Sequence, residues 1–470
     1  MHDLDAIVKA YDIRGVVPDQ LDDATAAALG VAAAEVLAHG SGAMVVGHDM
    51  RASSPSLADA FAAGVTAAGV DVVNAGLTST DQLYYASGAL DLPGAMFTAS
   101  HNPARYNGIK LCRAGAAPVG QETGLGEIKA SAEKSLAEGG PSRPASLPNA
   151  RPGTVEHRDT LGDYAAHLHG LVDLTGIRPL TVVVDAGNGM AGHTVPAVLG
   201  TGGVTVVPLY FELDGTFPNH EANPIDPATL VDLQATVRER GADLGLAFDG
   251  DADRCFVVDE RGAVVTPSAL TALIAVRELA RVPGSAIVHN LITSRAVPEI
   301  VTEHGGTPVR TRVGHSLIKQ TMAETGAVFG GEHSGHFYFR DFWRADSGML
   351  AALHTLAALG ADPQRRPLSQ LLQPYARYAA SGEINSTVDD AGAATARVEE
   401  SFGAGPGVSC DRLDGLTVEH AAAPMWWFNL RPSNTEPLLR LNVEAADEAT
   451  MARVRDDVLA TIRDRRKGHP

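Results

Sequence analysis

Short runs of β-branched and other apolar residues alternate along the chain with longer, Ala-rich stretches that have helical spacing. Residues 43–47 form one apolar run, residues 57–68 follow with a helical pattern, and residues 71–75 form the next run. Strands that alternate with helices in this way are typical of α/β folds. The pattern therefore predicts an α/β protein.

Three polar breaks divide this alternation into four parts, and the turn at residues 259–262 is the middle one. Residues 139–144 read GGPSRP and predict a linker, and residues 361–367 form a second polar, Pro-containing break. A chain of 470 residues is also too long for a single core. Three successive α/β units suggest a structural repeat, although no fixed-period sequence repeat is present. We expect domains at residues 1–150, 151–262, 263–370 and 371–470.

Composition and charge narrow the class of protein. The chain is 45% hydrophobic and 20% charged, as globular proteins are. Its net charge of −19 opposes binding to nucleic acid. The most apolar stretch, residues 26–38, is shorter than the roughly 18 to 20 residues of a membrane span, so we expect an amphipathic helix there. No protein partner is implied.

Two further features bear on the compartment. The N-terminus has no charged-then-apolar leader pattern. The three cysteines, Cys112, Cys255 and Cys410, lie far apart and lack metal-type spacing. We therefore expect a reduced, cytoplasmic chain.

Residues 249–253 read DGDAD and place three carboxylates directly after the apolar run 244–248. Such carboxylates repel one another unless a cation neutralises them, and oxygen-only ligands select Mg²⁺ or Ca²⁺. A helix-loop-helix calcium site would need Gly where the chain has Arg254, and helices where the pattern predicts strands. A solvated acidic turn is the other alternative, but the adjoining apolar run favours a metal site.

Residues 98–103, TASHNP, place the hydroxyl of Ser100 on a loop that follows the apolar run 94–97. A serine at such a position often only caps a turn, and the motif alone leaves this alternative open. A phosphorylated serine would need cationic neighbours, because a phosphoserine carries close to two negative charges. Lys110 and Arg14 are candidates.

Residues 330–336, GGEHSGH, offer a carboxylate, a hydroxyl and two imidazoles before an aromatic strand at 337–339. This loop can hydrogen-bond the hydroxyls of a sugar, and an ordinary polar loop is an equal alternative. A zinc site is less favoured, because the loop lacks the Cys or the helical His spacing of zinc sites.

Residues 431–437, RPSNTEP, combine a guanidinium, two hydroxyls and an amide in a Pro-bounded turn. A phosphate group can accept hydrogen bonds from all of these donors. The segment therefore favours phosphate binding over a simple turn.

These four segments, with residues 9–15, KAYDIRG, resemble the α-D-phosphohexomutase superfamily, most closely its bacterial phosphomannomutase/phosphoglucomutase branch. The resemblance spans nearly the whole chain. It implies four domains around a central cleft: three similar mixed α/β domains and a smaller C-terminal α+β domain. It also implies transfer of a phosphoryl group between C6 and C1 of a hexose phosphate, through a phosphoserine and a hexose 1,6-bisphosphate that serves as intermediate and activator.

The resemblance also implies roles for particular residues. Ser100 is the expected phosphoserine and a further ligand of a Mg²⁺ held by Asp249, Asp251 and Asp253. The expected catalytic neighbours are Arg14, His101, Lys110 and Arg254. The expected substrate-binding residues are Tyr11, His315, Glu332, Ser334, His336, Arg431, Ser433, Asn434 and Thr435. The general base stays open among His101, Lys110 and His315.

Within this family the sequence favours mannose phosphate as substrate, with activity on glucose phosphates. Residues 332–336 and 433–435 resemble phosphomannomutases more than phosphoglucosamine mutases. Leu291 stands where the dual-specificity relatives have a sugar-contacting Lys, which removes the basis for expecting that contact. Phosphoglucomutase, phosphoglucosamine mutase and, less readily, a metal-dependent sugar phosphatase are the alternatives. A sugar-phosphate sensor without activity would not need Ser100 together with three Asp residues.

Overall fold

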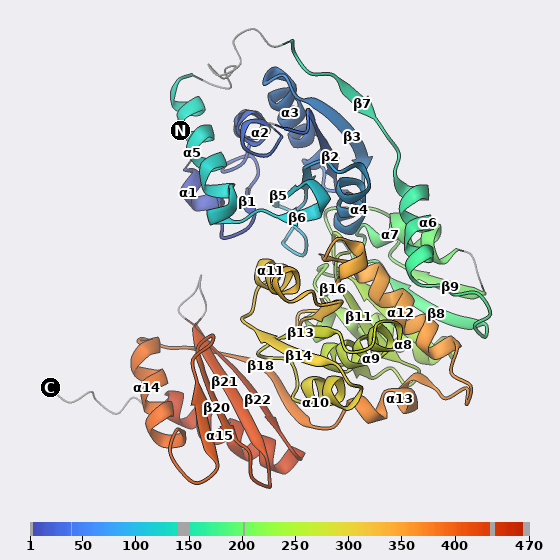
Figure 1. Cartoon of the computed structure of the whole chain (residues 1–470), viewed down its shortest axis with the longest axis vertical. Helices are drawn as coiled ribbons and strands as arrows, with labels where there is room; N and C mark the ends of the chain where they lie inside the picture. Colours follow the sequence, from blue (N-terminus) through green and yellow to red (C-terminus); the bar gives the residue numbers. More distant parts are fainter. Residues whose placement is uncertain (1–2, 39, 140–150, 201–202, 433–437, 464–470) are drawn as a thin grey trace, which may run out of the picture.

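The structure is a computed structural model and describes residues 3–38, 40–139, 151–200, 203–432 and 438–463. These residues form four units, each built on its own β-sheet. In Figure 1 the first unit lies at the top, the second and third lie together below it, and the fourth lies at the lower left. The expected fold of three α/β units and a C-terminal unit is confirmed.

The first three sheets repeat one strand order. The first contains β3 (Asp71–Leu77), β2 (Ala43–His48), β4 (Gly94–Phe97), β5 (Tyr106–Arg113) and β1 (Ile13–Val16). The second contains β9 (Val204–Leu209), β8 (Leu180–Asp185), β10 (Leu244–Phe248), β11 (Cys255–Asp259) and β12 (Val264–Val265). The third contains β14 (Thr307–Thr311), β13 (Ala286–Asn290), β15 (Phe329–Gly331), β16 (Phe337–Phe339) and β17 (Ala345–Asp346).

In each of these orders the first three strands pair in parallel. The fourth strand pairs antiparallel with the third, and the fifth pairs antiparallel with the fourth. The suggested repeat is therefore one of topology. The same loop of each repeat, between the last parallel strand and the first antiparallel one, carries a segment singled out by the sequence. These loops are β4–β5 with Ser100, β10–β11 with the three Asp residues, and β15–β16 with Glu332.

Helices flank the sheets. Those of the first unit are α1 (Leu4–Ile7), α2 (Asp23–Leu37), α3 (Ser54–Ala67), α4 (Thr80–Leu90) and α5 (Leu125–Ala137). Those that follow are α6 (Leu161–Leu171), α7 (Ala191–Leu199), α8 (Val231–Arg240), α9 (Pro267–Arg281), α10 (Ala296–Glu303), α11 (His315–Thr325), α12 (Gly348–Gly360) and α13 (Leu368–Leu371). Buried side chains of the second and third units, such as Val182 and Phe329, belong to one continuous core. These two units therefore pack as a single block.

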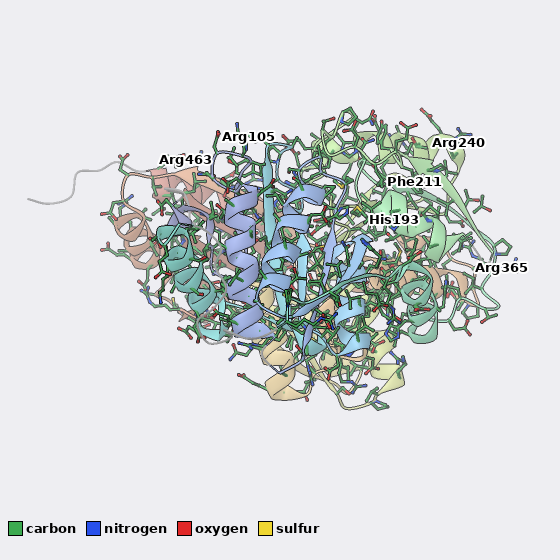
Figure 2. All side chains as sticks on the ribbon, turned by 90° about the horizontal axis from the view of Figure 1, so that it is seen from above. Arg105, His193, Phe211, Arg240, Arg365 and Arg463 are labelled. Carbon is green, nitrogen blue, oxygen red and sulfur yellow. The ribbon has the colours of Figure 1, made fainter. Side chains whose placement is uncertain are left out.

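The helix α2 differs from its prediction. Nine of the ten residues from 25 to 34 are buried, so the helix has no wide polar face. The reason is that α3 and α5 both pack against it, and Figure 2 shows α2 and α3 side by side from above. The approach is close, because a Cβ atom added to Gly30 would lie 2.2 Å from the carbonyl oxygen of Phe61. Small residues permit this contact on several sides of α2.

The fourth unit is an antiparallel sheet with its own core. Its strands, in order, are β18 (Ala379–Thr387), β22 (Leu438–Ala445), β21 (Trp426–Pro432), β20 (Leu416–His420) and β19 (Val408–Asp411). The helices α14 (Ala391–Phe402) and α15 (Glu448–Arg463) pack against it (Figure 1). This α+β arrangement differs from the three repeated units.

The strand β7 (Val155–His157) pairs in parallel with β3 at the edge of the first sheet. It follows residue 150, where the sequence places the end of the first domain. The chain thus returns to the first sheet before it enters α6. Among the described residues, no helix combines the length and the hydropathy that a membrane span requires.

Candidate active site

The three motif loops meet in a cleft of about 500 Å³. The expected site residues that line it are Tyr11, Arg14, Ser100, His101, Lys110, Asp253, Arg254 and His336. The loop that carries Ser100 (the serine loop) touches the loop that carries Asp249, Asp251 and Asp253 (the metal loop). The approach is so close that a Cβ atom on Gly250 would lie 2.5 Å from the carbonyl oxygen of Ser100. Gly at position 250 thus allows two domains to contribute to one reaction centre.

Ser100 is buried and its hydroxyl donates to Asp249 Oδ2 at 2.7 Å. Its backbone is left-handed, with a φ of 49°, which is unfavourable for a residue with a Cβ. Arg254 Nη2 lies 3.4 Å from Ser100 Oγ and also contacts His101 Nδ1, which is 3.2 Å from the same hydroxyl. The cation beside the serine is therefore Arg254.

The two cations that the sequence proposed for the serine are placed differently. Arg14 pairs with Asp12 at 2.6 Å and donates to the side chain of Asn102. Lys110 lies between two carboxylates, at 2.7 Å from Asp251 Oδ2 and 2.6 Å from Asp253 Oδ2. Although burial opposes it, these carboxylates raise the pKa of Lys110 well above its usual value, so its ammonium is charged.

Asp249, Asp251 and Asp253 are almost completely buried, and one carboxylate oxygen of each lies within 4.8 Å of the other two. Thr80, at the start of α4 in the first domain, donates its hydroxyl to Asp251 Oδ2 at 2.6 Å. The other oxygens, Asp251 Oδ1 and Asp253 Oδ1, accept no hydrogen bond from any residue that the structure describes. Buried carboxylate oxygens without donors, in an all-oxygen group, fit a hard divalent cation.

Burial also shifts the ionisation of the groups around Ser100. Burial raises the pKa of Asp249 to about 8, against the opposing effect of Arg254. Burial, together with the charges of Arg254 and Arg14, holds the pKa of His101 well below its usual value. His101 therefore presents a neutral imidazole beside the serine hydroxyl.

The sequence reasoning missed Arg51, which holds the serine loop. Its guanidinium is 1% exposed and donates to the carbonyl oxygens of residues 100, 102, 103 and 106 at 2.7 to 3.0 Å. It also pairs with the buried Asp49 at 3.2 Å. Four bonds from one side chain to one loop help to hold Ser100 in its left-handed conformation. The carbonyl groups that Arg51 contacts lie about fifty residues further along the chain, so no local motif indicates this role.

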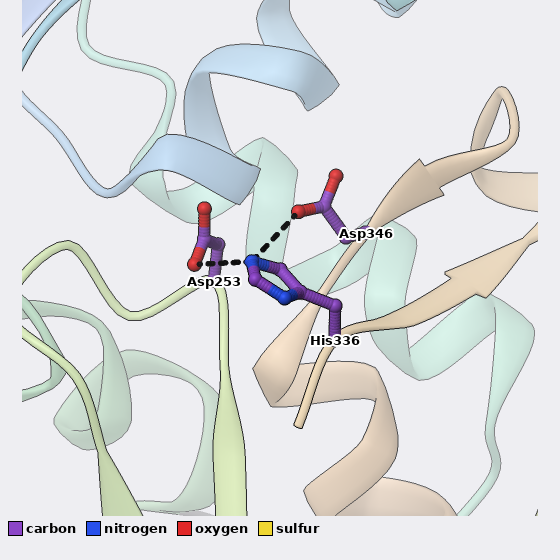
Figure 3. A group of neighbouring side chains, drawn as sticks. All are labelled: Asp253, His336 and Asp346. Carbon is purple, nitrogen blue, oxygen red and sulfur yellow. Dashed lines mark ion pairs between the residues drawn. The ribbon is translucent and has the colours of Figure 1, made fainter. Parts of the chain in front are cut away.

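The loop of residues 332–336, between β15 and β16, contributes His336 to the cleft from the third domain. It is called the sugar loop here because the sequence predicts that it binds the sugar. Ser334 Oγ donates to Glu332 Oε2 at 2.8 Å and lies 3.0 Å from His336 Nδ1. The far side of the His336 ring faces Asp253 of the metal loop and Asp346 of β17 (Figure 3). Asp346 in turn pairs with the buried Lys319, which lies 4.2 Å from the ring centre of Tyr84 in the first domain. The sequence reasoning identified neither Asp346 nor Lys319.

The fourth domain contributes two guanidiniums near the sugar loop. Arg431 on β21 lies opposite Arg440 on β22, and both pair with Glu383 on β18, at 3.3 and 3.4 Å. Burial, followed by the charges of Arg431, His336 and Arg440, lowers the pKa of His333 to about 3. The two arginines therefore lie beside the loop that carries Glu332 and Ser334. Arg440 was not expected from the sequence, since it lies outside the 431–437 segment.

Three expected residues, Ser433, Asn434 and Thr435, and the side chain of His315 lie outside what the structure describes. Leu291 is 2% exposed and lines a separate cavity of about 250 Å³ between the third and fourth domains. Position 291, for which the resemblance implied a sugar contact in other family members, is therefore apolar here and faces a domain interface.

A nucleophilic hydroxyl beside three carboxylates and an arginine is the arrangement of a metal-dependent phosphoryl-transfer enzyme. Models of the phosphoglucomutase/phosphomannomutase family match the chain four times: alpha/beta/alpha domains I, II and III at residues 5–138, 162–262 and 266–378, and the C-terminal domain at 383–461. The chain belongs to the phosphoglucomutase/phosphomannomutase family. The expected enzyme class, an intramolecular phosphotransferase, is confirmed with it.

Individual relatives agree with the family. The chain is 40% identical over 463 residues to a phosphomannomutase of Escherichia coli, with 97% of this chain and 98% of that protein covered. It is 37% identical over 456 residues to a phosphomannomutase/phosphoglucomutase of Pseudomonas aeruginosa, with 96% and 94% covered. The crystal structure of a phosphoglucomutase/phosphomannomutase family protein from Burkholderia thailandensis matches with a TM-score of 0.85 at 33% identity, over 99% of both chains.

Proposed function

We propose that this chain is a phosphomannomutase that interconverts mannose 6-phosphate and mannose 1-phosphate and also acts on glucose phosphates. The observation that carries the proposal is the Ser100 hydroxyl, held 2.7 Å from Asp249 at one side of a cleft whose other walls are the sugar loop and the loop bearing Tyr11 and Arg14. The relatives named phosphomannomutase and phosphomannomutase/phosphoglucomutase support the same substrates.

In this proposal Ser100 carries a phosphoryl group in the resting enzyme. The group passes to the free hydroxyl of the sugar monophosphate, giving a hexose 1,6-bisphosphate. The bisphosphate reorients, and its other phosphate returns to Ser100. Asp249, Asp251, Asp253 and the phosphoserine would hold Mg²⁺, which would supply charge neutralisation at the phosphoryl oxygens.

Three side chains would have the remaining roles in the reaction. Arg254, 3.4 Å from Ser100 Oγ, offsets charge on the transferring group, and charged Lys110 balances the metal-loop carboxylates. Because Lys110 is protonated, His101 is the better candidate for the general base. A phosphate on Ser100 would raise the pKa of His101 from its low value toward neutrality, where a base works best.

The sugar would bind between the two ends of the cleft. Glu332 and Ser334 would hold the C3 and C4 hydroxyls, which glucose and mannose share. Arg431 and Arg440 would hold the phosphate that does not react, since their donors lie beside the sugar loop. Only C2 differs between the two sugars, and a few contacts there are worth about 1 to 3 kcal/mol each.

A panel of substrates tests the proposal. We expect kcat/KM for mannose 1-phosphate to equal or exceed that for glucose 1-phosphate, and to exceed that for glucosamine 1-phosphate. Intact mass should show one phosphate, which Ser100→Ala removes together with nearly all turnover, while the exposed Ser56→Ala keeps both. A kcat/KM about a hundredfold higher for glucosamine 1-phosphate, equivalent to about 2.7 kcal/mol, would contradict mannose phosphate as the substrate. Release of free phosphate in place of isomer would favour a phosphatase.

A further inference from the structure

Residues 210–219 form the loop that follows β9 in the second domain (the β9 loop), and this loop reaches the first domain. Gly215 approaches so closely that a Cβ atom there would lie 2.7 Å from the Cα atom of Arg51. The guanidinium carbon of Arg51 lies 5.1 Å from the ring centre of Phe217, within the range of a cation–π contact. The side chain that holds the serine loop is therefore itself in contact with the second domain.

The backbone of the β9 loop is strained where it meets Arg51. Phe217 has a φ of 53°, in the left-handed region that a residue with a bulky side chain rarely adopts. Its amide donates to the carbonyl oxygen of Asp214 at 3.0 Å, a bond typical of a β-turn. Such strain persists only where the surrounding structure enforces it, and it is concentrated at functional sites. Ser100 and Phe217, which both contact Arg51, share this unfavourable backbone.

Asn188 holds the β9 loop from the neighbouring strand. It lies on the loop after β8 and is 3% exposed. Its side chain donates to the carbonyl oxygen of Glu212 at 2.9 Å and accepts from Asn219 at 2.8 Å. Its carbonyl oxygen accepts from the amide of Asp214 at 3.0 Å. One buried residue thus bonds to the β9 loop at three places.

The loop that carries Asn188 also touches the metal loop. The amide of Met190 donates to the carbonyl oxygen of Gly250 at 2.9 Å, and a Cβ atom on Gly189 would lie 2.7 Å from the same oxygen. The loops after β9, β8 and β10 are neighbours because these parallel strands are neighbours in the sheet. The serine loop and the metal loop are therefore joined twice, once directly and once through two loops of the second domain and Arg51.

We propose that Phe217 and Asn188 are positioning residues for phosphoryl transfer at Ser100. Asn188 fixes the β9 loop, and Phe217 holds Arg51 in the orientation in which it bonds to the serine loop. The ring of Phe217 also helps to exclude water from the guanidinium, which strengthens the bonds of Arg51 to the carbonyl oxygens. The effect on turnover rests on the proposed function, but the effect on the order of the serine loop does not.

Hydrogen exchange of the full chain, followed by mass spectrometry, tests the effect on the serine loop. Amides of this loop, such as that of Asn102, are hydrogen-bonded within it, so their exchange reports its order. Loss of one desolvated cation–π contact should raise the exchange rate of residues 99–106 about tenfold in Phe217→Ala. Phe217→Tyr keeps the ring and should exchange as the wild type does. Leu213→Ala is the matched control, because Leu213 is 36% exposed on the same loop.

Steady-state kinetics tests the effect on turnover, with whichever hexose 1-phosphate the substrate panel shows to react fastest. Phe217→Ala should lower kcat about tenfold and change KM less than about threefold, because it misplaces a reacting group and removes no substrate contact. Phe217→Tyr and Leu213→Ala should keep the wild-type kcat. Asn188→Asp, which loses the donor to Glu212, should also lower kcat. Combined with Phe217→Ala it should lower kcat by less than the product of the two single effects, because both act through Arg51.

Three results would overturn the proposal: exchange of residues 99–106 at the wild-type rate in Phe217→Ala, faster exchange there without a fall in kcat, or equal losses of kcat in Phe217→Ala and Leu213→Ala. A wild type that isomerises no hexose phosphate would contradict the proposed function. The exchange rates would still decide whether Phe217 orders the serine loop, since they require no substrate.

Discussion

Two junctions between domains, one at Ser100 and one between the third and fourth domains, are built from different kinds of contact. At the serine end, buried groups join the first domain to the second, such as Thr80 to Asp251 at 2.6 Å. Between the third domain and the fourth, several ion pairs are partly exposed, such as Arg310 and Asp411 at 36% and 41%. Buried networks fix geometry, whereas exposed pairs contribute little and are screened by salt. The junction at the serine end is therefore the more rigidly organised of the two.

This difference suits a reaction in which a bisphosphate must turn around. The groups that transfer the phosphoryl group gain from fixed positions. In the proposed function the fourth domain holds whichever phosphate of the sugar does not react, so weaker attachment of that domain costs less. Four sets of substitutions test this comparison.

Replacement of Arg51 should have the largest effect. Arg51→Met leaves Asp49 buried without its counter-charge, which should lower the free energy of unfolding by about 3 to 5 kcal/mol. Arg51→Lys keeps the charge but offers fewer donors to the serine loop, so we expect a folded protein in which kcat falls more than KM rises. Denaturant unfolding and steady-state kinetics measure both effects.

Arg105→Lys is the control for this prediction, because Arg105 lies on the same loop but at the outer surface (Figure 2). Equal kcat values in the two Lys variants would show that Arg51 does not position Ser100.

The pH dependence of the free energy of unfolding tests the buried junction at Asp81. Its carboxylate accepts hydrogen bonds at 2.7 Å from Tyr164 of α6 and from Ser347, which caps α12, so it joins the first domain to the second and third block. Burial raises its pKa from 3.8 to about 6. The folded state therefore binds this proton more tightly than the unfolded state does. The resulting stability is complete below about pH 4 and is lost as the pH rises to about 6.

We expect the free energy of unfolding of the wild type to fall by up to about 3 kcal/mol relative to Asp81→Asn across that window. Unfolding curves between pH 4 and 7 measure the difference. Asp71→Asn is the control. Hydrogen bonds from Thr154 lower the pKa of Asp71, so the stability that it contributes is lost only below about pH 4, and this variant should run parallel to the wild type between pH 4 and 7. A parallel pH dependence of wild type and Asp81→Asn would contradict the prediction.

Arg440→Met should act on binding alone. Loss of charged hydrogen bonds to phosphate, worth about 1.5 to 3 kcal/mol, should raise KM by roughly 10- to 100-fold. The serine end stays intact, so kcat should change little. Arg412→Met, at an exposed pair with Glu399 in the same domain, should leave KM unchanged. A fall in kcat without a rise in KM would show that Arg440 does not bind the phosphate.

The smallest effect is expected for the exposed pair between Arg310 and Asp411. A double-mutant cycle with Arg310→Gln and Asp411→Asn should give a coupling energy of about 0.2 to 1 kcal/mol. It should approach zero near 1 M salt, where the screening length is about 3 Å. A coupling above about 2 kcal/mol that survives high salt would show that the junction between the third and fourth domains is held as firmly as the serine end.

The residues that the sequence identified share one property. Ser100, the three Asp residues and Glu332 each lie in a short contiguous segment after an apolar strand, so local pattern and chemistry are enough to find them. The strand boundaries were also accessible, since 94–97, 244–248 and 337–339 coincide with β4, β10 and β16. Local information suffices where a loop and its strand specify the site together.

The residues that the sequence reasoning missed act on distant parts of the chain. Arg51 bonds to a loop that begins at residue 100, and Asp346 and Lys319 converge on the cleft from different elements. Arg440 becomes informative only because β22 pairs it with Arg431. The burial of α2 was inaccessible for the same reason, since its Ala-rich pattern does not show how many neighbours pack on it. Tertiary pairing, and not residue type, defines these roles.

The return of the chain to the first sheet has a consequence for protein fragments. The three exposed residues of β7 cover the edge of β3, although they follow the segment that the family match assigns to domain I. A fragment cut at residue 150 would leave that edge open, and an open edge strand pairs readily with another copy. A piece intended for isotope labelling or separate expression should therefore extend through His157.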